Sequence, residues 1–362
     1  MTHRQRILAT LTGEAADRPP VAPDLSEWLK VNRAAGTLPD RYAGMDLLSL
    51  HRDIGAGLPW HAYGEFLTVG NHRCEMTVED DGDVRTKTIR TPRGALREVS
   101  VRTDASAGSY FRREHFVKEI ADLEILAEYL TDRTFAPDVA GCRRVLDWLG
   151  EDGVMDLVVP KSCLPMLLNN QYVEMSAGIM MLMDHPAACE ALMAAVEEAE
   201  VPFFGMLGAL PARLAIFPHN LDVTMIPPNW FERYLLPYYR RHCRILHEAD
   251  KVVSVHADGR LRPLLGLLAR TEIDVLDGCT PAPMNDYEPE ELAAAIPAHM
   301  KLWMGVPATL FCQRGVTADQ IRSFARRILD TFPGRVVLNV GDQLPPNGDI
   351  EKVRALIAAA EG

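Results

Sequence analysis

The stretch Lys251–Thr271, KVVSVHADGRLRPLLGLLART, shows the unit from which most of the chain is built. A short apolar run, Val252–Val255, has the length of a buried strand, and an apolar segment with helical spacing follows it after Gly259. His256 and Asp258 stand between the two, where the strand ends. A buried strand that ends on an imidazole and a carboxylate needs a reason, because either group is costly to bury without a partner.

The same strand-then-helix pattern recurs along most of the sequence. We predict seven strands, at residues 19–24, 154–162, 213–220, 251–258, 272–279, 301–308 and 335–342. Near-continuous apolar strands that alternate with helices are typical of a parallel sheet with helices on both faces. Seven or eight such units in 362 residues favour an α/β fold of the (β/α)8 TIM-like barrel type. An open sheet is the alternative, but no predicted strand is followed by the GxGxxG motif of its dinucleotide-binding form.

Residues from about 65 to 117 follow a different pattern. Apolar and polar residues alternate there around Asp-Gly and Arg-Gly turns, which predicts an antiparallel β-hairpin insertion near the N-terminus. Apart from this insertion, we expect residues 1–362 to form a single barrel domain.

Composition and charge exclude several classes of function. The net charge of −12 and the pI near 5.4 argue against a protein that binds nucleic acid or an anionic membrane through a basic surface. Seven cysteines without a CxxC pair indicate neither a disulfide framework nor a zinc finger, which suits a reducing compartment. No apolar run has the length of a membrane span, and the first residues lack a signal-peptide pattern. We therefore expect a cytoplasmic protein that acts on a small molecule, and a homo-oligomer is left open.

Polar and ionisable residues gather where the predicted strands end. In a barrel of parallel strands the active site lies at the carboxyl ends of the strands. The residues found there are Asp24, Lys161, Ser162, His219, Asp222, His256, Asp258, Cys279 and Asp342. So many titratable groups on one rim predict a site rather than an ordinary surface.

His256 and Asp258 are two residues apart and share a face if the strand continues that far. With Asp342, and with Cys279 as a further candidate, they have the donor atoms that suit zinc. Without a metal, the pair could act as proton donor and acceptor. The alternative is structural: Asp258 with Gly259 would form a turn and cap the next helix.

The other rim residues also have two interpretations each. Cys279 is a ligand or nucleophile, or a small buried apolar residue. His219 is a catalytic group or a hydrogen-bonded loop histidine, and Asp342 is a ligand or a capping residue of its Pro-rich loop. Local sequence alone does not separate these alternatives.

Four motifs follow one another in an order that is informative. They are THRQRILATLTGEAADRPPVAPD at the start, TIRTPRGALREVS with REHFVKEIADLEILAEYL, then VVSVHADG, and finally VVLNVGDQLPPNGDIEKVRAL. Together they resemble the uroporphyrinogen decarboxylase superfamily, in its corrinoid-dependent methyltransferase-like branch. The resemblance extends over essentially the whole chain.

This resemblance implies a distorted (β/α)8 barrel with a deep site at its C-terminal mouth. The best-known methyltransferases of the branch bind zinc through a His-x-Cys pair and a further Cys after the last strand, and the positions that match are His256, Asp258 and Asp342. Carboxylates therefore stand where those relatives have cysteines. Such a harder His/Asp/Asp site would bind Zn²⁺ or another divalent metal and polarise water, an alkoxide or a carboxylate.

The resemblance leads to one main hypothesis and two alternatives. The first is a methyltransferase that moves a methyl group between a small methylated compound and a corrinoid (cobalamin) carried by a partner protein. His256 and Asp258 would be catalytic in it, and the substrate-binding candidates are Asp24, His219, Asp222 and Cys279. A non-catalytic barrel that binds a corrinoid protein is a further alternative.

The other alternative is a cofactor-independent decarboxylase of the uroporphyrinogen decarboxylase type. Arg33 and Arg41 only loosely resemble the Arg-rich motif with which that enzyme binds substrate carboxylates, although Asp53 follows them. A substrate with many carboxylates would call for more arginine near the first strand, since arginine pairs with carboxylates in a bidentate way.

Overall fold

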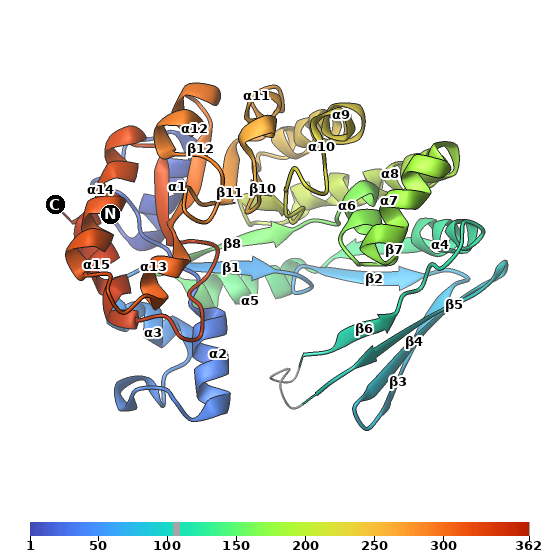
Figure 1. The fold of residues 1–362 in the computed structure, drawn as a ribbon, viewed down its shortest axis with the longest axis horizontal. Coiled ribbons are helices and arrows are strands. Elements are labelled where there is room, and N and C mark those ends of the chain that lie inside the picture. Colours follow the sequence, from blue (N-terminus) through green and yellow to red (C-terminus); the bar gives the residue numbers. More distant parts are fainter. Residues whose placement is uncertain (104–108, 362) are drawn as a thin grey trace. The chain divides into compact units, whose positions relative to one another are not determined.

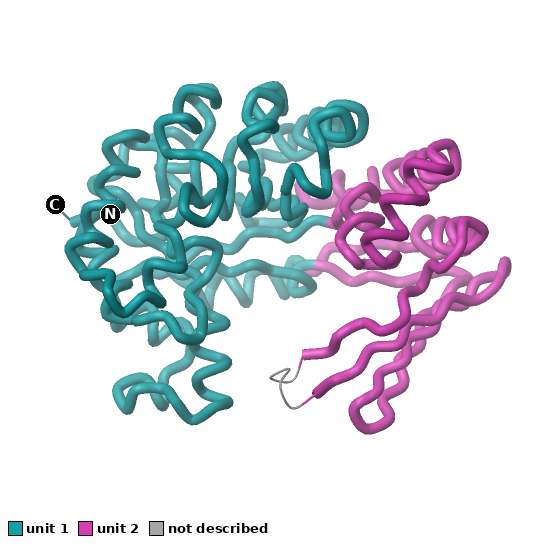
Figure 2. The backbone as a smooth tube through the Cα atoms, viewed as in Figure 1, with its two compact units in different colours: residues 1–66, 139–159, 210–362 teal, residues 67–138, 160–209 magenta. Residues whose placement is uncertain are grey.

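In the computed structural model, which describes residues 1–103 and 109–361, the chain forms two compact units (Figure 2). Unit 1 comprises Met1–Phe66, Val139–Val159 and Leu210–Gly362, and unit 2 comprises Leu67–Asp138 and Pro160–Ala209. Most of the predicted insertion, from Leu67 onward, lies in unit 2.

Unit 1 is built on a seven-stranded sheet with the order β1-β8-β9-β10-β11-β12-β13. Every neighbouring pair of strands in it is parallel. The strands are β1 (Leu58–Ala62), β8 (Gly153–Val158), β9 (Leu214–Phe217), β10 (Val252–His256), β11 (Val275–Cys279), β12 (Lys301–Val306) and β13 (Val336–Val340). Strands β8, β9, β11 and β13 are buried along their whole length, as expected of a parallel sheet covered on both faces.

Helices connect these strands (Figure 1). They are α1 (His3–Thr12), α2 (Ser26–Ala35), α3 (Leu47–Ile54), α5 (Val139–Leu149), α9 (Pro228–Trp230), α10 (Leu236–Glu248), α11 (Leu265–Leu268), α12 (Pro289–Ala295), α13 (Ala308–Cys312), α14 (Ala318–Thr331) and α15 (Ile350–Ala360). A π-helical turn, Phe231–Leu235, joins α9 to α10.

Helix α1 closes the amino-terminal end of the sheet. A capping box begins this helix: the Thr2 side chain accepts from the Gln5 backbone, and the Gln5 side chain accepts from the Thr2 backbone. Its apolar residues Ile7 and Leu11 belong to a buried cluster with side chains from the sheet and the segment before α2, namely Ala22, Val154, Leu214, Val275, Trp303 and Val337. Because these contacts involve mainly the first residues of the strands, polar groups are left to the carboxyl ends.

Six of the seven predicted strands are present, and the seventh differs. Residues 19–24 form no strand but a single parallel bridge, Val21 to Leu338 of β13. Gly57, just before β1, donates its backbone N–H to Val21 O at 2.9 Å, so this segment hydrogen-bonds to residues at both edges of the sheet. The α/β class with a parallel sheet is confirmed, whereas a closed eight-stranded barrel is not shown.

Strand β1 was missed by the sequence reasoning. Its sequence, LPWHA, holds a proline and a histidine within five residues, so neither an apolar run nor an alternation stands out. Pairing with β8 makes it a strand, since the partner supplies the ladder of hydrogen bonds from Leu58 to Ala62.

Unit 2 contains two antiparallel sheets. Strand β2 (Leu67–Asn71) pairs with β7 (Arg133–Pro137), and β3 (Glu75–Asp81), β4 (Val84–Thr91), β5 (Gly94–Val101) and β6 (Phe111–Glu114) follow one another in a meander. Its helices are α4 (Asp122–Thr131), α6 (Cys163–Leu168), α7 (Met175–Asp184) and α8 (Pro186–Met206). The expected antiparallel meander is therefore present.

No single helix in the described part of the chain is both long and apolar enough to cross a membrane. The segments Met175–Asp184 and Pro186–Ala209 meet the length and composition criteria only when taken together, and they are bent by 108° where they join.

Substitution of Gly305 in β12 tests how closely this strand packs against the loop after β13. A methyl group on Gly305 would lie 2.1 Å from the Gly341 backbone nitrogen, and backbone cannot rotate away. We expect Gly305→Ala to lower the free energy of unfolding by about 1–3 kcal/mol, measured by urea denaturation. Gly266→Ala in α11 is the control, since no atom beyond its chain neighbours and its own helix backbone lies within 4 Å of the added methyl group, and stability should be unchanged or slightly higher. Equal effects of the two changes would contradict this packing.

Candidate active site

A cavity of about 290 Å³ opens at the carboxyl ends of the strands of unit 1. Strand ends and the loops that follow them supply its lining: Asp24, Pro59, His61, Tyr63, Val158, Ile216, Pro218, Asn220, His256, Asp277, Trp303, Asn339, Asp342 and Gln343. Three aspartates and two histidines are among these residues, but no lysine or arginine is. The cavity is therefore acidic, and its size suits a small ligand.

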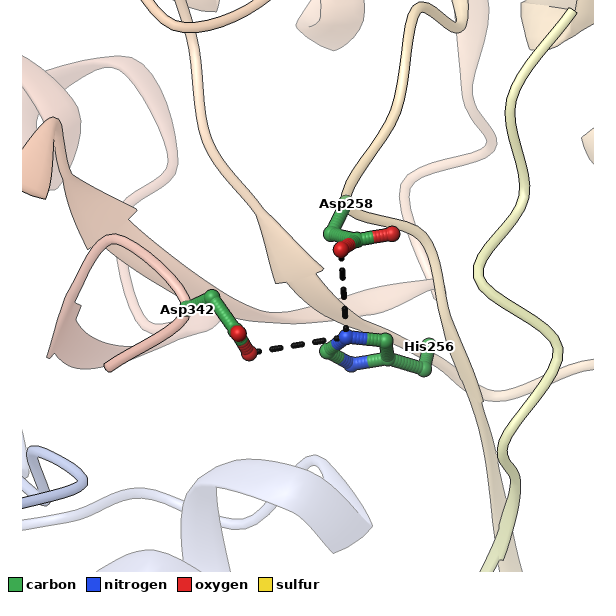
Figure 3. Close-up of side chains that lie close together, drawn as sticks. All are labelled: His256, Asp258 and Asp342. Atoms are coloured by element: carbon green, nitrogen blue, oxygen red, sulfur yellow. Dashed lines mark ion pairs between the residues drawn. The ribbon is translucent and has the colours of Figure 1, made fainter. Parts of the chain in front are cut away.

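His256 is the last residue of β10 and the centre of a cluster of carboxylates (Figure 3). Its Nδ1 lies 2.8 Å from Oδ2 of Asp277. Its Nε2 faces the other two carboxylates, 3.6 Å from Oδ2 of Asp258 and 3.5 Å from Oδ1 of Asp342. One ligand atom from each of His256, Asp258 and Asp342 lies within 4.8 Å of the others, which is the spacing of a potential metal site.

Asp277 is a functional candidate that the sequence reasoning missed. It pairs in register with His256 across β10 and β11, so both side chains point to the same face. The strand ends at Cys279, as predicted, but its pairing with β12 is irregular between Asp277 and Cys279. Gly278 makes the irregularity possible: its φ is +69°, and a methyl group there would lie 2.6 Å from Cε1 of His256. An aspartate in an apolar strand was the signal that could have identified it.

The cap interpretation of Asp258 finds little support in the loop that follows. The next helical turn begins at Arg262, and the backbone N–H groups of Leu261 and Arg262 donate to Oδ1 of Asp286 at 3.0 and 3.2 Å. Asp286 thus has the capping role. The carboxylate of Asp258 instead faces the His256 ring.

Asn339 links the loop that contains Asp342 to the segment that contains Asp24. Its Oδ1 accepts from the backbone N–H of Asp24 at 3.1 Å and of Val340 at 2.7 Å. Its amide Nδ2 donates to the backbone oxygen of Asp342 at 3.2 Å. One buried side chain therefore sets the positions of two cavity aspartates, Asp24 and Asp342.

The pKa values of His256 and Asp342 are both raised. Burial by itself would lower the pKa of His256, but its hydrogen bonds to Asp258 and Asp277 and the charge of Asp342 raise that pKa well above its usual value. Burial, together with the neighbouring aspartates, raises the pKa of Asp342. A divalent cation among these groups would replace the protons and relieve the repulsion between the carboxylates.

A second histidine–aspartate pair lies at the same cavity. His61 of β1 is in register with Asp156 of β8, and its Nδ1 lies 3.0 and 2.9 Å from the two carboxylate oxygens. Sequence reasoning missed both residues, because β1 was not recognised and Asp156 stood within a predicted strand. A buried charge in an apolar strand, Asp156 in VMDLVV, again was the available signal.

Of the four predicted substrate-binding residues, only Asp24 lines the cavity. His219 is 0% exposed, and its Nδ1 lies 2.6 Å from the hydroxyl of Tyr239. Cys279 is also 0% exposed, with Sγ directed at Leu276 O and Trp303 O. The structure therefore keeps His219 and Cys279 within the protein interior.

Asp222 and two further rim residues have local structural positions. Asp222 accepts hydrogen bonds from the backbone N–H groups of Thr224 and Arg260, as a turn residue does. Strand β8 ends at Val158, so Lys161 and Ser162 lie beyond it, with Ser162 at the N-cap position of α6.

Comparison with known proteins identifies a family. The model of the family described as uroporphyrinogen decarboxylase (URO-D) matches residues 157–362, more than half of the chain. No curated protein matches.

The solved structures that resemble the chain do so only distantly. D-psicose 3-epimerase from Clostridium cellulolyticum H10 has 10% identity and a TM-score of 0.35, and covers 62% of this chain and 82% of its own. The pneumococcal virulence factor StrH has 8% identity and a TM-score of 0.41, with 97% and 84% covered. A Bacteroides ovatus GH5 xyloglucanase has 9% identity and a TM-score of 0.32, with 84% and 98% covered. Similarity at this level gives no information about the site.

The buried position of Cys279 can be tested with a thiol reagent. Six cysteines are buried and only Cys312 is partly exposed. Burial raises the pKa of the Cys279 thiol far above its usual value, so no reactive thiolate forms. We expect a chromogenic disulfide reagent to label at most Cys312 in the folded protein and all seven cysteines after unfolding. The Cys312→Ala variant should show no labelling before it is unfolded. Rapid labelling of Cys279 in the folded protein, located by peptide mass spectrometry, would restore it as a nucleophile or ligand.

Proposed function

Because the chain belongs to the uroporphyrinogen decarboxylase family, we propose that it is an enzyme of the family's methyltransferase type. It moves a methyl group between a small methylated compound and a corrinoid, a form of cobalamin, carried by a partner protein. The observation that carries the proposal is a small acidic cavity with no lysine or arginine in its described lining, beside which three side chains could together bind a metal ion.

The cluster fits Zn²⁺ or a similar divalent ion. It offers one imidazole nitrogen and two carboxylate oxygens, and both donor types are common in zinc sites. Asp277 at Nδ1 corresponds to the carboxylate that usually orients a metal-binding histidine and sets its tautomer. With three protein ligands, a coordination position would remain for the substrate, as in catalytic rather than structural zinc sites.

The residues of the chain have distinct tasks in such a reaction. Breaking the bond to the methyl carbon leaves an electron pair on the oxygen, nitrogen or sulfur atom that held it, and that atom must be stabilised. A bound metal supplies a Lewis acid for this purpose. His256, Asp258 and Asp342 would hold it, Asp277 keeps the His256 ring in place, and Trp303 with the prolines limits the cavity to a small substrate.

The decarboxylase alternative receives less support from the same cavity. A substrate with many carboxylates needs positive side chains to pair with them. Arg41 pairs with Asp53 at 2.8 Å, Arg354 pairs with the same aspartate at 2.7 Å, and Arg33 donates to the backbone oxygen of Met45. These arginines interact with residues 45 and 53 and do not line the cavity.

Metal content tests the cluster directly. We expect the purified protein to bind a divalent ion, and His256→Ala and Asp342→Asn to lose it, as measured by elemental analysis and Zn²⁺ titration calorimetry. Asp277→Asn should weaken binding by roughly 10–100-fold, the usual effect of losing the partner of a ligand. Because the raised pKa of His256 makes protons compete with the metal, affinity should rise with pH over the neutral range.

A matched control exists on the surface of unit 1. His247 also pairs with an aspartate, Asp274, at 2.9 Å, but this pair does not line the cavity. His247→Ala should leave the metal content unchanged. Equal metal in the wild type and His256→Ala would remove the ligand assignment.

Turnover separates the three functional hypotheses. We expect methyl transfer from a small methylated compound to a reduced corrinoid protein, followed by the absorbance of the corrinoid, and a loss of about 100-fold or more in Asp258→Asn. Release of CO₂ from a porphyrinogen substrate would instead establish the decarboxylase. An Asp258→Asn variant as fast as the wild type would exclude Asp258 from the reaction, and binding of the corrinoid protein without turnover would favour the non-catalytic barrel.

A further inference from the structure

His61 and Asp156 form a polar pair that is not part of the candidate metal cluster. The Asp156 side chain is 7% exposed and the His61 side chain 30%, so the carboxylate lies behind the imidazole, and the imidazole lines the cavity. Both carboxylate oxygens of Asp156 are within 3.0 Å of Nδ1. Nε2 is therefore the ring nitrogen left to meet a ligand.

The surroundings of His61 keep it protonated. Burial by itself would lower the pKa of His61, but the charge and hydrogen bonds of Asp156, with smaller effects of Asp277 and Asp24, outweigh burial and raise that pKa to about 10. Burial also raises the pKa of Asp156, so the pair as a whole retains a proton at neutral pH. His61 consequently offers an N–H donor at Nε2.

An acidic cavity makes such a donor necessary for one class of leaving group. If a methyl group leaves an oxygen atom, that oxygen becomes an alkoxide or phenolate. A bound metal would offset the charge of Asp342, but the carboxylates of Asp24 and Asp277 would still repel the oxygen. A thiolate is a far weaker base than an alkoxide, and an amine leaves a quaternary ammonium as a neutral molecule. Only the oxygen leaving group therefore gains strongly from a proton donor in this cavity.

We propose that His61, positioned by Asp156, donates its Nε2 proton to the oxygen atom from which the methyl group departs, so that the substrate is a small methyl ether. This inference rests on the proposed methyl transfer. The bond between the methyl carbon and oxygen breaks. The reduced cobalt of the partner's corrinoid supplies the electron pair of the new bond to the methyl carbon. The oxygen keeps the electrons of the broken bond, takes the proton and leaves as an alcohol or phenol, and solvent returns a proton to His61.

The kinetic test uses aryl methyl ethers that differ in the acidity of the phenol they release. General acids contribute about 10²–10⁴-fold to such steps. His61→Gln should therefore lower kcat by about 10²-fold or more for ethers that release weakly acidic phenols, and have little effect for nitrophenyl ethers, whose leaving groups need no proton. The wild-type rate should fall as pH rises through the pKa of His61, and Asp156→Asn should move this fall to lower pH.

A binding test gives a readout that does not depend on turnover. A nitrophenol changes its absorbance on ionisation, and beside the cationic His61 the bound form should be shifted toward the phenolate in the wild type. His61→Gln and Asp156→Asn should lose this shift, and His247→Gln, which alters the surface pair with Asp274, should keep it. Circular dichroism and thermal unfolding show whether each variant is folded, and Asp156→Asn provides a second route if His61→Gln is not.

The outcomes distinguish this inference from the proposed function. Methyl transfer with the same dependence on the leaving group in the wild type and His61→Gln overturns the role of His61 but leaves the methyltransferase intact. A wild type that transfers no methyl group overturns the proposed function and the acid step with it. In that case, a nitrophenol shift that depends on His61 shows only an oxygen-binding donor. A nitrophenol spectrum that is equal in the wild type and His61→Gln excludes even that.

Discussion

Two cross-strand pairs of the same kind organise the candidate site. His256 pairs in register with Asp277 on β10 and β11, and His61 pairs in register with Asp156 on β1 and β8. Side chains at paired positions of neighbouring parallel strands point to the same face, so each carboxylate lies directly beside an imidazole. Because each aspartate contacts Nδ1 of its histidine, Nε2 is the ring nitrogen that could bind a metal or a substrate. The rest of the cavity is arranged around these two rings.

Both pairs depend on the opposite end of the sheet being closed. Helix α1 packs Ile7 and Leu11 against the first residues of the strands, which makes that end apolar. Charged groups buried there would lack partners and destabilise the fold. At the carboxyl ends, each aspartate that is buried has a histidine or backbone N–H groups nearby, and solvent in the cavity lessens the remaining cost. The separation of packing at one end from chemistry at the other is the usual arrangement of parallel α/β enzymes.

Sequence reasoning identified the parts of the fold that are governed by local pattern. Six strands and the antiparallel meander follow directly from apolar runs and turn residues. His256, Asp258 and Asp342, which the sequence pattern grouped together, also lie close to one another, because strand ends in a parallel sheet meet at one edge. Strand β1 could not be found this way, since its five residues show no periodicity and its pairing with β8 makes it a strand. His61 was lost from the candidate site for the same reason.

The sequence by itself determined the parallel α/β class, six of the seven strands of the main sheet, the acidic character of the protein and three of the cluster residues. Only the tertiary structure decided which polar residues face the cavity. Cys279 and His219 stand at strand ends in the sequence, yet the irregularity of β11 at Gly278 and the hydroxyl of Tyr239 keep them inside. Asp277 and Asp156 stand within apolar strands, yet they contact the two histidines. The physical reason is that side-chain direction depends on strand register and local bulges, which long-range hydrogen bonds establish.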